Sequence, residues 1–111
     1  MKVYIAGRMK GLEDYNRKNF IQAEKYLKRI GFKEVINPYK LSLKLKEKLN
    51  LKEFTDIKRS RYLKNDIKEL IECDVIALLP SYVNSKGAKM ELHIARELRM
   101  GIFYINEEDL K

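Results

Sequence analysis

Short apolar runs alternate along this chain with longer stretches in which apolar residues recur every three or four positions. A short apolar run is typical of a buried strand, and the longer spacing is typical of an amphipathic helix. Strands are expected at residues 2–6, 34–37, 74–80 and 102–105. Helices are expected at residues 14–30, 55–72 and 87–100. Residues 39–53 alternate Leu and Lys in a way that fits either helix or extended chain, so they stay unassigned.

Strands that alternate with helices predict a parallel sheet with right-handed crossovers. We therefore expect an α/β fold, a flavodoxin- or Rossmann-like three-layer sandwich whose four-stranded parallel sheet has the order 2-1-3-4. A chain of 111 residues can build one core but not two, so residues 1–111 are expected to form a single domain. In such a sheet, ligands bind beyond the carboxyl ends of the strands, where the strand order reverses.

Nothing in the sequence suggests a membrane or an oxidising compartment. No stretch approaches the about 18 to 20 apolar residues that a membrane span needs. The apolar run of four residues before Gly7 is too short for the core of a signal peptide. Cys73 is the only cysteine, which excludes an internal disulfide and fits a reducing compartment. We expect a cytoplasmic protein with no membrane partner.

The net charge of +8 suggests an anionic partner and is concentrated in the segment Lys40–Lys64. This basic segment is either a flap that attracts a phosphorylated ligand or nucleic acid, or a solvated helical face. No zinc-finger spacing, aromatic-rich strand motif or Gly-x-x-Gly clamp accompanies the charge, so nucleic-acid binding stays a minor hypothesis.

Two loops follow expected strands at the edge where ligands bind. The first is the run Gly7, Arg8, Met9, Lys10 and Gly11. The second runs from Ser81 to Ala88 and contains the step Ser85-Lys86-Gly87 into a helix, which offers a hydroxyl and free N–H groups to a phosphate. The alternative remains open that Ser85 only caps the helix and that the glycines only turn the chain.

Two carboxylates fall on apolar helical stripes. In the helix at 87–100 the inward arc consists of Ala88, Leu92, Ile94, Ala95 and Leu98, and Glu91 lies within it. In the helix at 55–72 the stripe consists of Leu63, Ile67, Leu70 and Ile71, and Asp66 lies on it. Burying an unpaired carboxylate is costly, so each needs either a partner or a chemical purpose. A buried ion pair with a Lys or Arg side chain, or a carboxylate that caps backbone groups, is one reading; glycosyl transfer, which uses two carboxylates, is the other.

The sequence suggests no metal and no other cofactor. His93 is the only histidine, and Cys73 has no second ligand at metal-binding spacing. His93 is expected on the surface, on the side of its helix away from Glu91. Arg61 and Tyr62 either contact the ligand or pack the helix, and the pattern does not separate these roles.

Three blocks of the sequence resemble the nucleoside 2-deoxyribosyltransferase-like superfamily, and most of all its small DUF4406 branch. The blocks are VYIAGRMKGL at the N-terminus, then Arg61-Tyr62-x3-Asp66-x3-Leu70-x2-Cys73-Asp74, then Leu79-Pro80-x4-Ser85-x-Gly87-Ala88-x2-Glu91-x3-Ala95. The resemblance spans nearly the whole chain. It implies that Glu91 is the nucleophile that attacks the anomeric carbon, that Asp66 assists at the base or sugar, and that Tyr4 orients the nucleophile. It also implies a homodimer or a larger homo-oligomer.

In this superfamily the residue six positions before the nucleophile distinguishes two groups. Transferases of free nucleosides have an acid there, whereas this chain has Ser85, which is similar to the 5′-monophosphate N-glycosidases. A serine can donate to a phosphate that an acid would repel. Arg8 and Lys10 could add charge-assisted hydrogen bonds, although Arg8 stands where the glycosidases have a small serine. The expected four strands also differ from the five of larger relatives.

These observations predict an enzyme that cleaves the N-glycosidic bond of a nucleoside or deoxynucleoside 5′-monophosphate. Glu91 would attack C1′ through an oxocarbenium-like transition state, and burial should raise the pKa of Asp66 so that it can act as an acid. The alternative is a module that binds a nucleotide without turnover. A third hypothesis, a nucleic-acid adaptor built on the basic segment, would not depend on Glu91.

Overall fold

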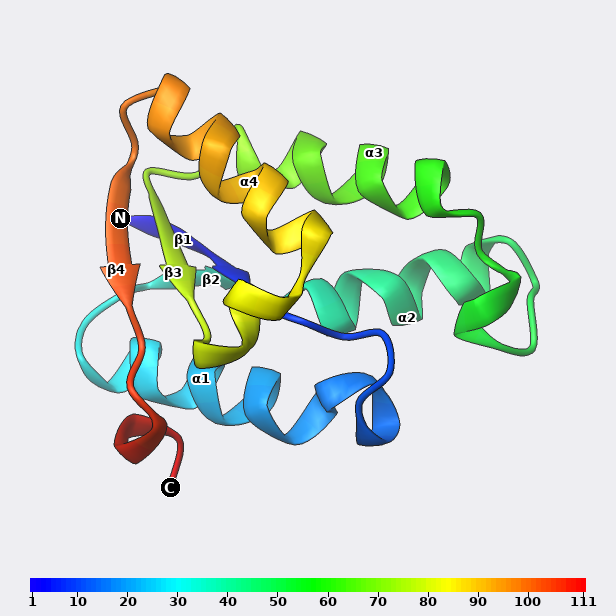
Figure 1. Ribbon diagram of the computed structural model, residues 1–111, viewed down its shortest axis with the longest axis horizontal. Coiled ribbons are helices and arrows are strands. Elements are labelled where there is room, and N and C mark those ends of the chain that lie inside the picture. Colours follow the sequence, from blue (N-terminus) through cyan, green and yellow to red (C-terminus); the bar gives the residue numbers. More distant parts are fainter.

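The computed structural model describes residues 1–111 and contains four parallel strands in the order β2-β1-β3-β4 (Figure 1). The strands are β1 (Lys2–Ala6), β2 (Glu34–Ile36), β3 (Val75–Leu78) and β4 (Gly101–Tyr104). The α/β class, the parallel sheet and the strand order are therefore as expected. All four strands lie within two residues of the predicted bounds, because a short apolar run marks each of them in the sequence.

Four α-helices and four short 3-10 helices connect and flank these strands. The α-helices are α1 (Arg17–Arg29), α2 (Pro38–Lys48), α3 (Arg59–Leu70) and α4 (Lys86–Glu97). The 3-10 helices are η1 (Glu13–Asn16), η2 (Phe54–Asp56), η3 (Pro80–Asn84) and η4 (Glu107–Leu110). None of the α-helices combines the length and apolar character that crossing a bilayer requires.

Four details of the helices differ from the sequence prediction. The helix expected from residue 14 begins at Arg17, because Asp14, Tyr15 and Asn16 have positive φ. The unassigned stretch contains α2, which begins at Pro38 because proline is preorganised for a first helical position and Asn37 caps the helix by accepting from the Tyr39 N–H. The prediction that a helix begins at residue 55 was wrong, since η2 and an extended Ile57 precede α3. Leu98 and Ile71, placed on inward arcs, are exposed because each lies just past the last turn of its helix.

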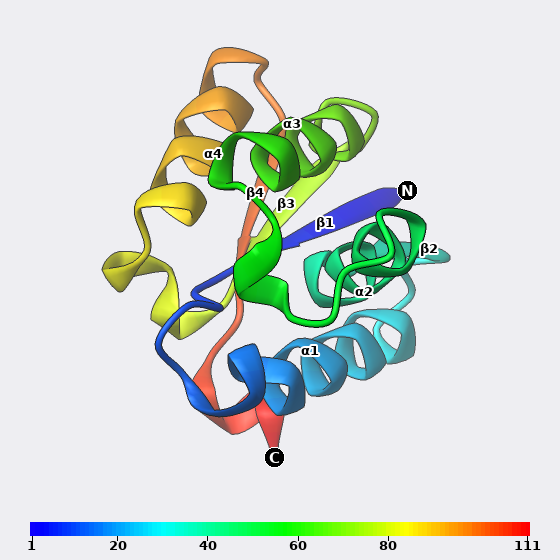
Figure 2. The same cartoon turned by 90° about the vertical axis from the view of Figure 1, so that its right-hand side faces the viewer.

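Each strand sends alternate side chains to the two faces of the sheet. Val3 and Ile5 of β1 face α1 and η4, whereas Tyr4 and Ala6 face α3 and α4. The sheet is therefore the middle of three layers. Helix α2 lies between α1 and α3 next to β2, as the second view shows (Figure 2).

The strand order reverses between β1 and β3. From β1 the chain crosses to β2 on one side of the sheet, and later returns to β3 on the other side of β1. The loops that leave β1 and β3 lie close together, and the Leu79 N–H donates to the Ala6 carbonyl at 2.8 Å. Gly7 is required at this point, because a Cβ added there would lie 2.9 Å from Cβ of Leu79.

Candidate active site

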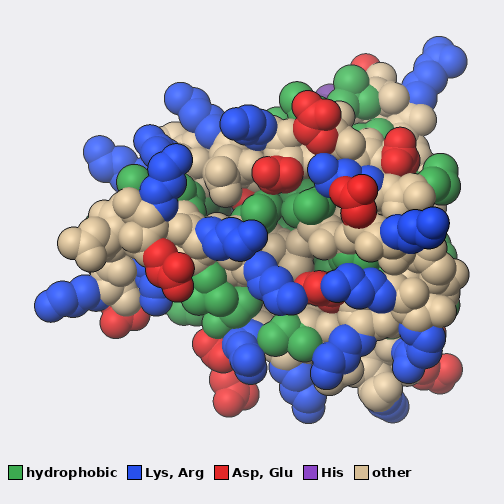
Figure 3. Space-filling view, turned by 180° about the vertical axis from the view of Figure 1, so that it is seen from behind, with side chains coloured by type: hydrophobic (Ala, Val, Ile, Leu, Met, Phe, Trp, Pro, Cys, Tyr) green, Lys and Arg blue, Asp and Glu red, His purple; other side chains and the backbone are tan.

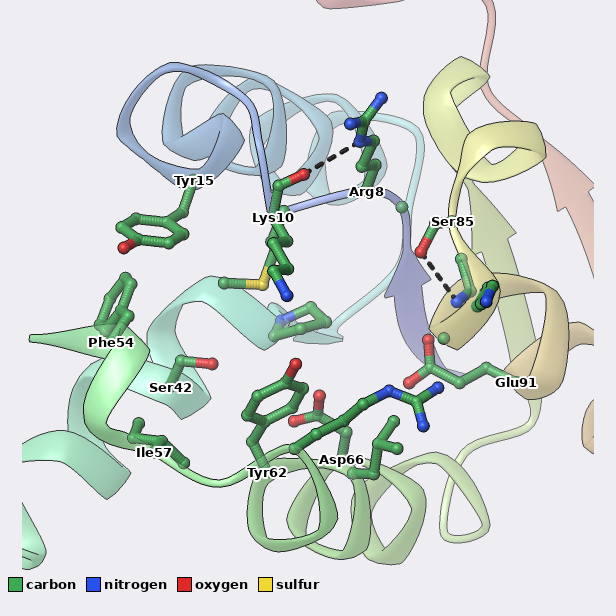
Figure 4. Close-up of a pocket in the computed structure, with 18 of the residues that line it drawn as sticks. Arg8, Lys10, Tyr15, Ser42, Phe54, Ile57, Tyr62, Asp66, Ser85 and Glu91 are labelled. Atoms are coloured by element: carbon green, nitrogen blue, oxygen red, sulfur yellow. Dashed lines mark hydrogen bonds between the residues drawn. The ribbon is translucent and has the colours of Figure 1, made fainter.

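A cavity of about 980 Å³ lies beyond the carboxyl ends of β1 and β3 (Figure 4). The ten residues predicted from the sequence all line it: Tyr4, Gly7, Arg8, Met9, Lys10, Gly11, Asp66, Ser85, Gly87 and Glu91. They come from β1 and its following loop, from α3, and from the N-terminal half of α4. The cavity is therefore at the strand-order reversal where ligands bind in this class of sheet.

Tyr4 and Glu91 form a buried pair on the floor of the cavity. The strand alternation directs Tyr4 towards α4, and the helical spacing from Ala88 directs Glu91 back towards β1. The Tyr4 hydroxyl donates a hydrogen bond to Oε2 of Glu91. Tyr4 is fully buried and Glu91 is only 6% exposed, so this hydrogen bond is shielded from water.

Asp66 approaches the same floor from α3. It is 7% exposed, and its Oδ1 atom is buried without a hydrogen-bond partner. Neither Asp66 nor Glu91 forms an ion pair, since both ion pairs of the chain are made by Glu24. The reading of these two carboxylates as buried ion pairs is therefore wrong. Protein sites rarely leave a buried polar atom unpaired without a reason.

Burial raises the pKa values of all three groups. It raises the pKa of Asp66 to about 7. Burial and then the neighbouring Asp66 charge raise the pKa of Glu91 to about 8, against the opposing effect of the Tyr4 hydrogen bond. Burial and the two carboxylates raise the pKa of Tyr4 well above its usual value, so its phenol stays a hydrogen-bond donor. At neutral pH the two carboxyl groups therefore share at least one proton.

The N-terminus of α4 forms one wall of the cavity. Ser85 caps this helix, with its Oγ accepting from the Ala88 N–H at 3.1 Å. Ser85 therefore caps the helix, and its hydroxyl proton remains available to a ligand. The N–H groups of Lys86 and Gly87, in the first helical turn, have no acceptor within the helix. A Cβ added at Gly87 would meet no atom closer than 3.7 Å, so this glycine leaves open space rather than relieving a clash.

The loop after β1 forms the adjoining wall and is held by its own hydrogen bonds. The Arg8 N–H donates to Oγ of Ser81 at 3.0 Å, and Nε of Arg8 donates to the Lys10 carbonyl at 2.9 Å. Gly11 has φ +84°, and a Cβ there would lie 2.8 Å from Nη2 of Arg8. Glycine is thus needed at residue 11 for the turn, and Arg8 is partly committed to the loop rather than free for a ligand.

The remaining wall of the cavity was not predicted. It is formed by Tyr15 of η1, Ser42 of α2 and the segment from Phe54 to Arg59. Of the two residues with an open role, Tyr62 lines the cavity and Arg61 does not. The sequence held little signal for this wall, because residues 39–53 were unassigned and residue 55 was placed inside a helix. His93 is exposed, as expected.

The basic segment serves several roles rather than forming one patch. Lys40 pairs with Glu24 at 3.0 Å, and Nζ of Lys46 lies 5.2 Å from the centre of the Phe54 ring. Of the charged side chains in this segment, only those of Lys58 and Arg59 line the cavity. On the face opposite to that of Figure 1, Lys and Arg side chains are spread over the whole surface with Asp and Glu among them (Figure 3).

No cluster of three or more metal-ligating side chains occurs in the structure. Cys73 lies outside the cavity lining, donates to the Glu69 carbonyl, and has a pKa raised by burial to about 11.

Neither a curated protein nor a solved structure matches the chain. The model of one protein family does match, over residues 1–104, and its description is a domain of unknown function, DUF4406. The chain therefore belongs to the DUF4406 family.

Proposed function

We propose that the protein cleaves the N-glycosidic bond of a nucleoside 5′-monophosphate, with Glu91 as the nucleophile. The observation that carries this proposal is the pair of buried carboxyl groups, Asp66 and Glu91, that no cation neutralises and that face a large cavity. Enzymes that cleave glycosidic bonds usually carry two carboxyl groups beside the anomeric carbon that is attacked. The resemblance to nucleoside 2-deoxyribosyltransferases supports the same roles for Glu91, Asp66 and Tyr4.

The phosphate is proposed to bind at the N-terminus of α4. The Ser85 hydroxyl, the free N–H groups of Lys86 and Gly87, and the positive end of the helix dipole all favour an anion there. Glu91 follows one turn later on the same helix. A phosphate held at the first turn would therefore fix the sugar over Glu91, which is the positioning that such a reaction needs.

The reaction begins when the Glu91 carboxylate attacks C1′. The C1′–N bond breaks as a C1′–O ester bond to Glu91 forms, and the electron pair of the broken bond leaves with the base. Asp66 donates its proton to that base. Water, or the nitrogen of a second base, then attacks C1′ and releases Glu91 as a carboxylate, while Asp66 takes up the proton of the attacking group. All atoms and charges balance without a cofactor.

This mechanism requires one proton on the pair, placed on Asp66. The Tyr4 hydrogen bond favours the ionised form of Glu91, whereas Asp66 has no donor that favours its ionised form. The pKa of Glu91 is nevertheless raised to about 8 and that of Asp66 to about 7, so in the free protein the proton favours Glu91 despite this hydrogen bond. The mechanism therefore requires the substrate to move the proton to Asp66, which the positive charge that develops at C1′ would do by stabilising the Glu91 carboxylate.

A chromatographic assay of free base tests the proposal. The substrates are a panel of nucleoside 5′-monophosphates and the matching nucleosides, and the variant is Glu91→Gln, which keeps the shape of the side chain. We expect release from one or more monophosphates, none from the nucleosides, and a loss of about a thousandfold or more in the variant. The control is Glu97→Gln, an exposed change on the same helix outside the cavity. Release that is unchanged in Glu91→Gln would refute the nucleophile role.

A nucleotide-binding module without turnover is the second candidate. It is favoured by the raised pKa of Glu91, because a protonated carboxyl group is a poor nucleophile. The same panel separates the two functions. If no base is released while a monophosphate raises the melting temperature of the protein, the binding module is right and the enzyme is wrong.

A further inference from the structure

One short segment beside the cavity has an unusual backbone. Asp14, Tyr15 and Asn16 are consecutive and have φ of 47°, 53° and 64°, so all three are left-handed. Asp and Asn tolerate this region because their short polar side chains bond locally, but a tyrosine rarely adopts it. Tyr15 is therefore the residue at which sequence preference and backbone conformation conflict. Such conflicts are concentrated at functional sites.

The segment is held in this conformation from both sides. Nδ2 of Asn16 donates to the Arg8 carbonyl at 2.8 Å, which fastens it to the loop after β1. Nδ2 of Asn19 donates to Oδ1 of Asn16 at 2.8 Å, and the Tyr15 N–H donates to the Leu12 carbonyl at 3.0 Å. The position of Tyr15 is thus tied to the same loop that forms a wall of the cavity.

The strained backbone places the Tyr15 ring on the cavity, against Phe54. The two ring centres are 4.8 Å apart with an angle of 67° between the ring planes, and Phe54 also packs on Tyr39 at 5.5 Å. We call Tyr15 and Phe54 the aromatic end of the cavity. It lies at the opposite end from Ser85 and Glu91, with Tyr62 and Asp66 between (Figure 4).

We propose that the aromatic end is a subsite for the planar base of the ligand and that Tyr15 is a residue that determines specificity for it. The inference rests on the proposed function, because a phosphate bound at Ser85 and a sugar over Glu91 leave the base to extend towards this end. Aromatic rings bind a base through its π-face and exclude water from it. The free energy gained by stacking a base on Tyr15 would offset the cost of its left-handed backbone, which the fold alone does not favour.

The experiment compares deoxynucleoside 5′-monophosphates with 2-deoxyribose 5-phosphate, which has the same sugar and phosphate but no base. Binding of both probes is measured calorimetrically for the wild type, Tyr15→Asn and Tyr15→Phe, each carrying Glu91→Gln so that the nucleotide is not cleaved during the titration. Asparagine suits the left-handed backbone, so Tyr15→Asn relieves the conflict while removing the ring. A melting curve of each variant accompanies the binding data, and Tyr104→Asn, outside the cavity lining, is the control.

We expect Tyr15→Asn to weaken nucleotide binding by about tenfold or more, leave binding of 2-deoxyribose 5-phosphate unchanged, and melt no lower than the wild type. Tyr15→Phe should bind nucleotides as the wild type does. The inference is overturned if Tyr15→Asn binds nucleotides normally, or if it loses both probes equally. It is also overturned if the wild type binds the two probes equally well, which would leave the proposed function standing. A wild type that binds neither probe refutes both.

Discussion

Two glutamates on opposite sides of the sheet have similarly small exposed fractions, but Glu91 lies deeper in the protein and the two have opposite surroundings. Glu24 of α1 is 8% exposed and Glu91 of α4 is 6% exposed. Lys28, Lys40 and Asn37 all donate to Glu24, and these bonds outweigh the effect of burial so that its pKa is lowered. Glu91 has a phenol and a second carboxyl group as neighbours, and its pKa is raised to about 8.

The comparison shows that this chain has enough cations to neutralise a buried carboxylate and pairs none of them with Asp66 or Glu91. It contains 24 Lys and Arg residues against 16 Asp and Glu, so the lack of a partner for Asp66 and Glu91 does not reflect a shortage of positive charge. A buried carboxyl group without a cation lowers the stability of the folded protein. It is also more reactive, because its raised pKa lets it gain or lose a proton near neutral pH. Glu24 is a structural group by this criterion, and Asp66 and Glu91 are candidates for chemistry.

The largest expected effect is on the pH dependence of stability. The pKa of Asp66 is raised from 3.8 to about 7 in the folded protein, so its contribution is fully present below about pH 4 and is lost as the pH rises through 7. The loss amounts to about 4 kcal/mol, since one pKa unit corresponds to about 1.4 kcal/mol. Asp66→Asn, which cannot ionise, should therefore be the more stable protein at pH 8 and should have a flatter profile.

Urea unfolding at pH 5, 6, 7 and 8 measures this difference between wild type and Asp66→Asn. Glu97→Gln is the matched control, because it removes one exposed negative charge from the surface of α4. If the stability of Asp66→Asn falls with pH in parallel with the wild type, Asp66 is not protonated in the folded protein, and the contrast with Glu24 is lost.

A second, smaller effect is expected from Tyr4→Phe. The change removes the only hydrogen bond that favours the ionised form of Glu91, so the pKa of Glu91 should rise further. We expect turnover at pH 7 to fall about 10- to 100-fold, with the acidic limb of the pH–rate profile moving to higher pH. Tyr104→Phe, which lies outside the cavity, should leave the profile unchanged. A loss of turnover with no movement of the limb would contradict an effect on the pKa of Glu91 and would show that the hydroxyl only positions its carboxylate, because Phe keeps the packing of the ring.

The sequence predicted the fold well wherever one periodicity dominated. The apolar runs of β1 and β3 and the helical stripe of α4 each have a single reading, and each element is where it was expected. Helix α2 was missed because Leu41, Leu43 and Leu45 recur every second residue, which imitates a strand. The local evidence that decides for helix, the Asn37 cap and Pro38 at the first position, lies at its beginning rather than in its pattern.

The candidate site could be predicted only in part, for a related reason. Asp66 and Glu91 could be predicted because each is a charged residue at a position where the helical periodicity predicts an apolar one, and both are buried in the structure. Tyr4 fits its strand as a core aromatic, so the role proposed for it came from the family resemblance rather than from the residues. Tyr15 gave no signal, because the role proposed for it depends on a left-handed backbone that no neighbouring residue type requires.

The smallest expected effect is that of neutralising Glu24, and it tests the other half of the comparison. Glu24→Gln removes the charge that Lys28 and Lys40 neutralise, but both lysine side chains are 54% exposed and stay hydrated, so we expect a loss of only about 1 kcal/mol at pH 7. Because the pKa of Glu24 is lowered by folding, its contribution is present above about pH 4.5 and is lost at lower pH, the opposite of Asp66. Unfolding curves at pH 7 and pH 3 should therefore show the variant less stable at pH 7 and equal to the wild type at pH 3, with base release unchanged throughout. If Glu24→Gln instead reduces base release without lowering stability, the side of the sheet covered by α1 takes part in the reaction, and burial with paired cations is no longer a guide to which carboxylates of this fold are structural.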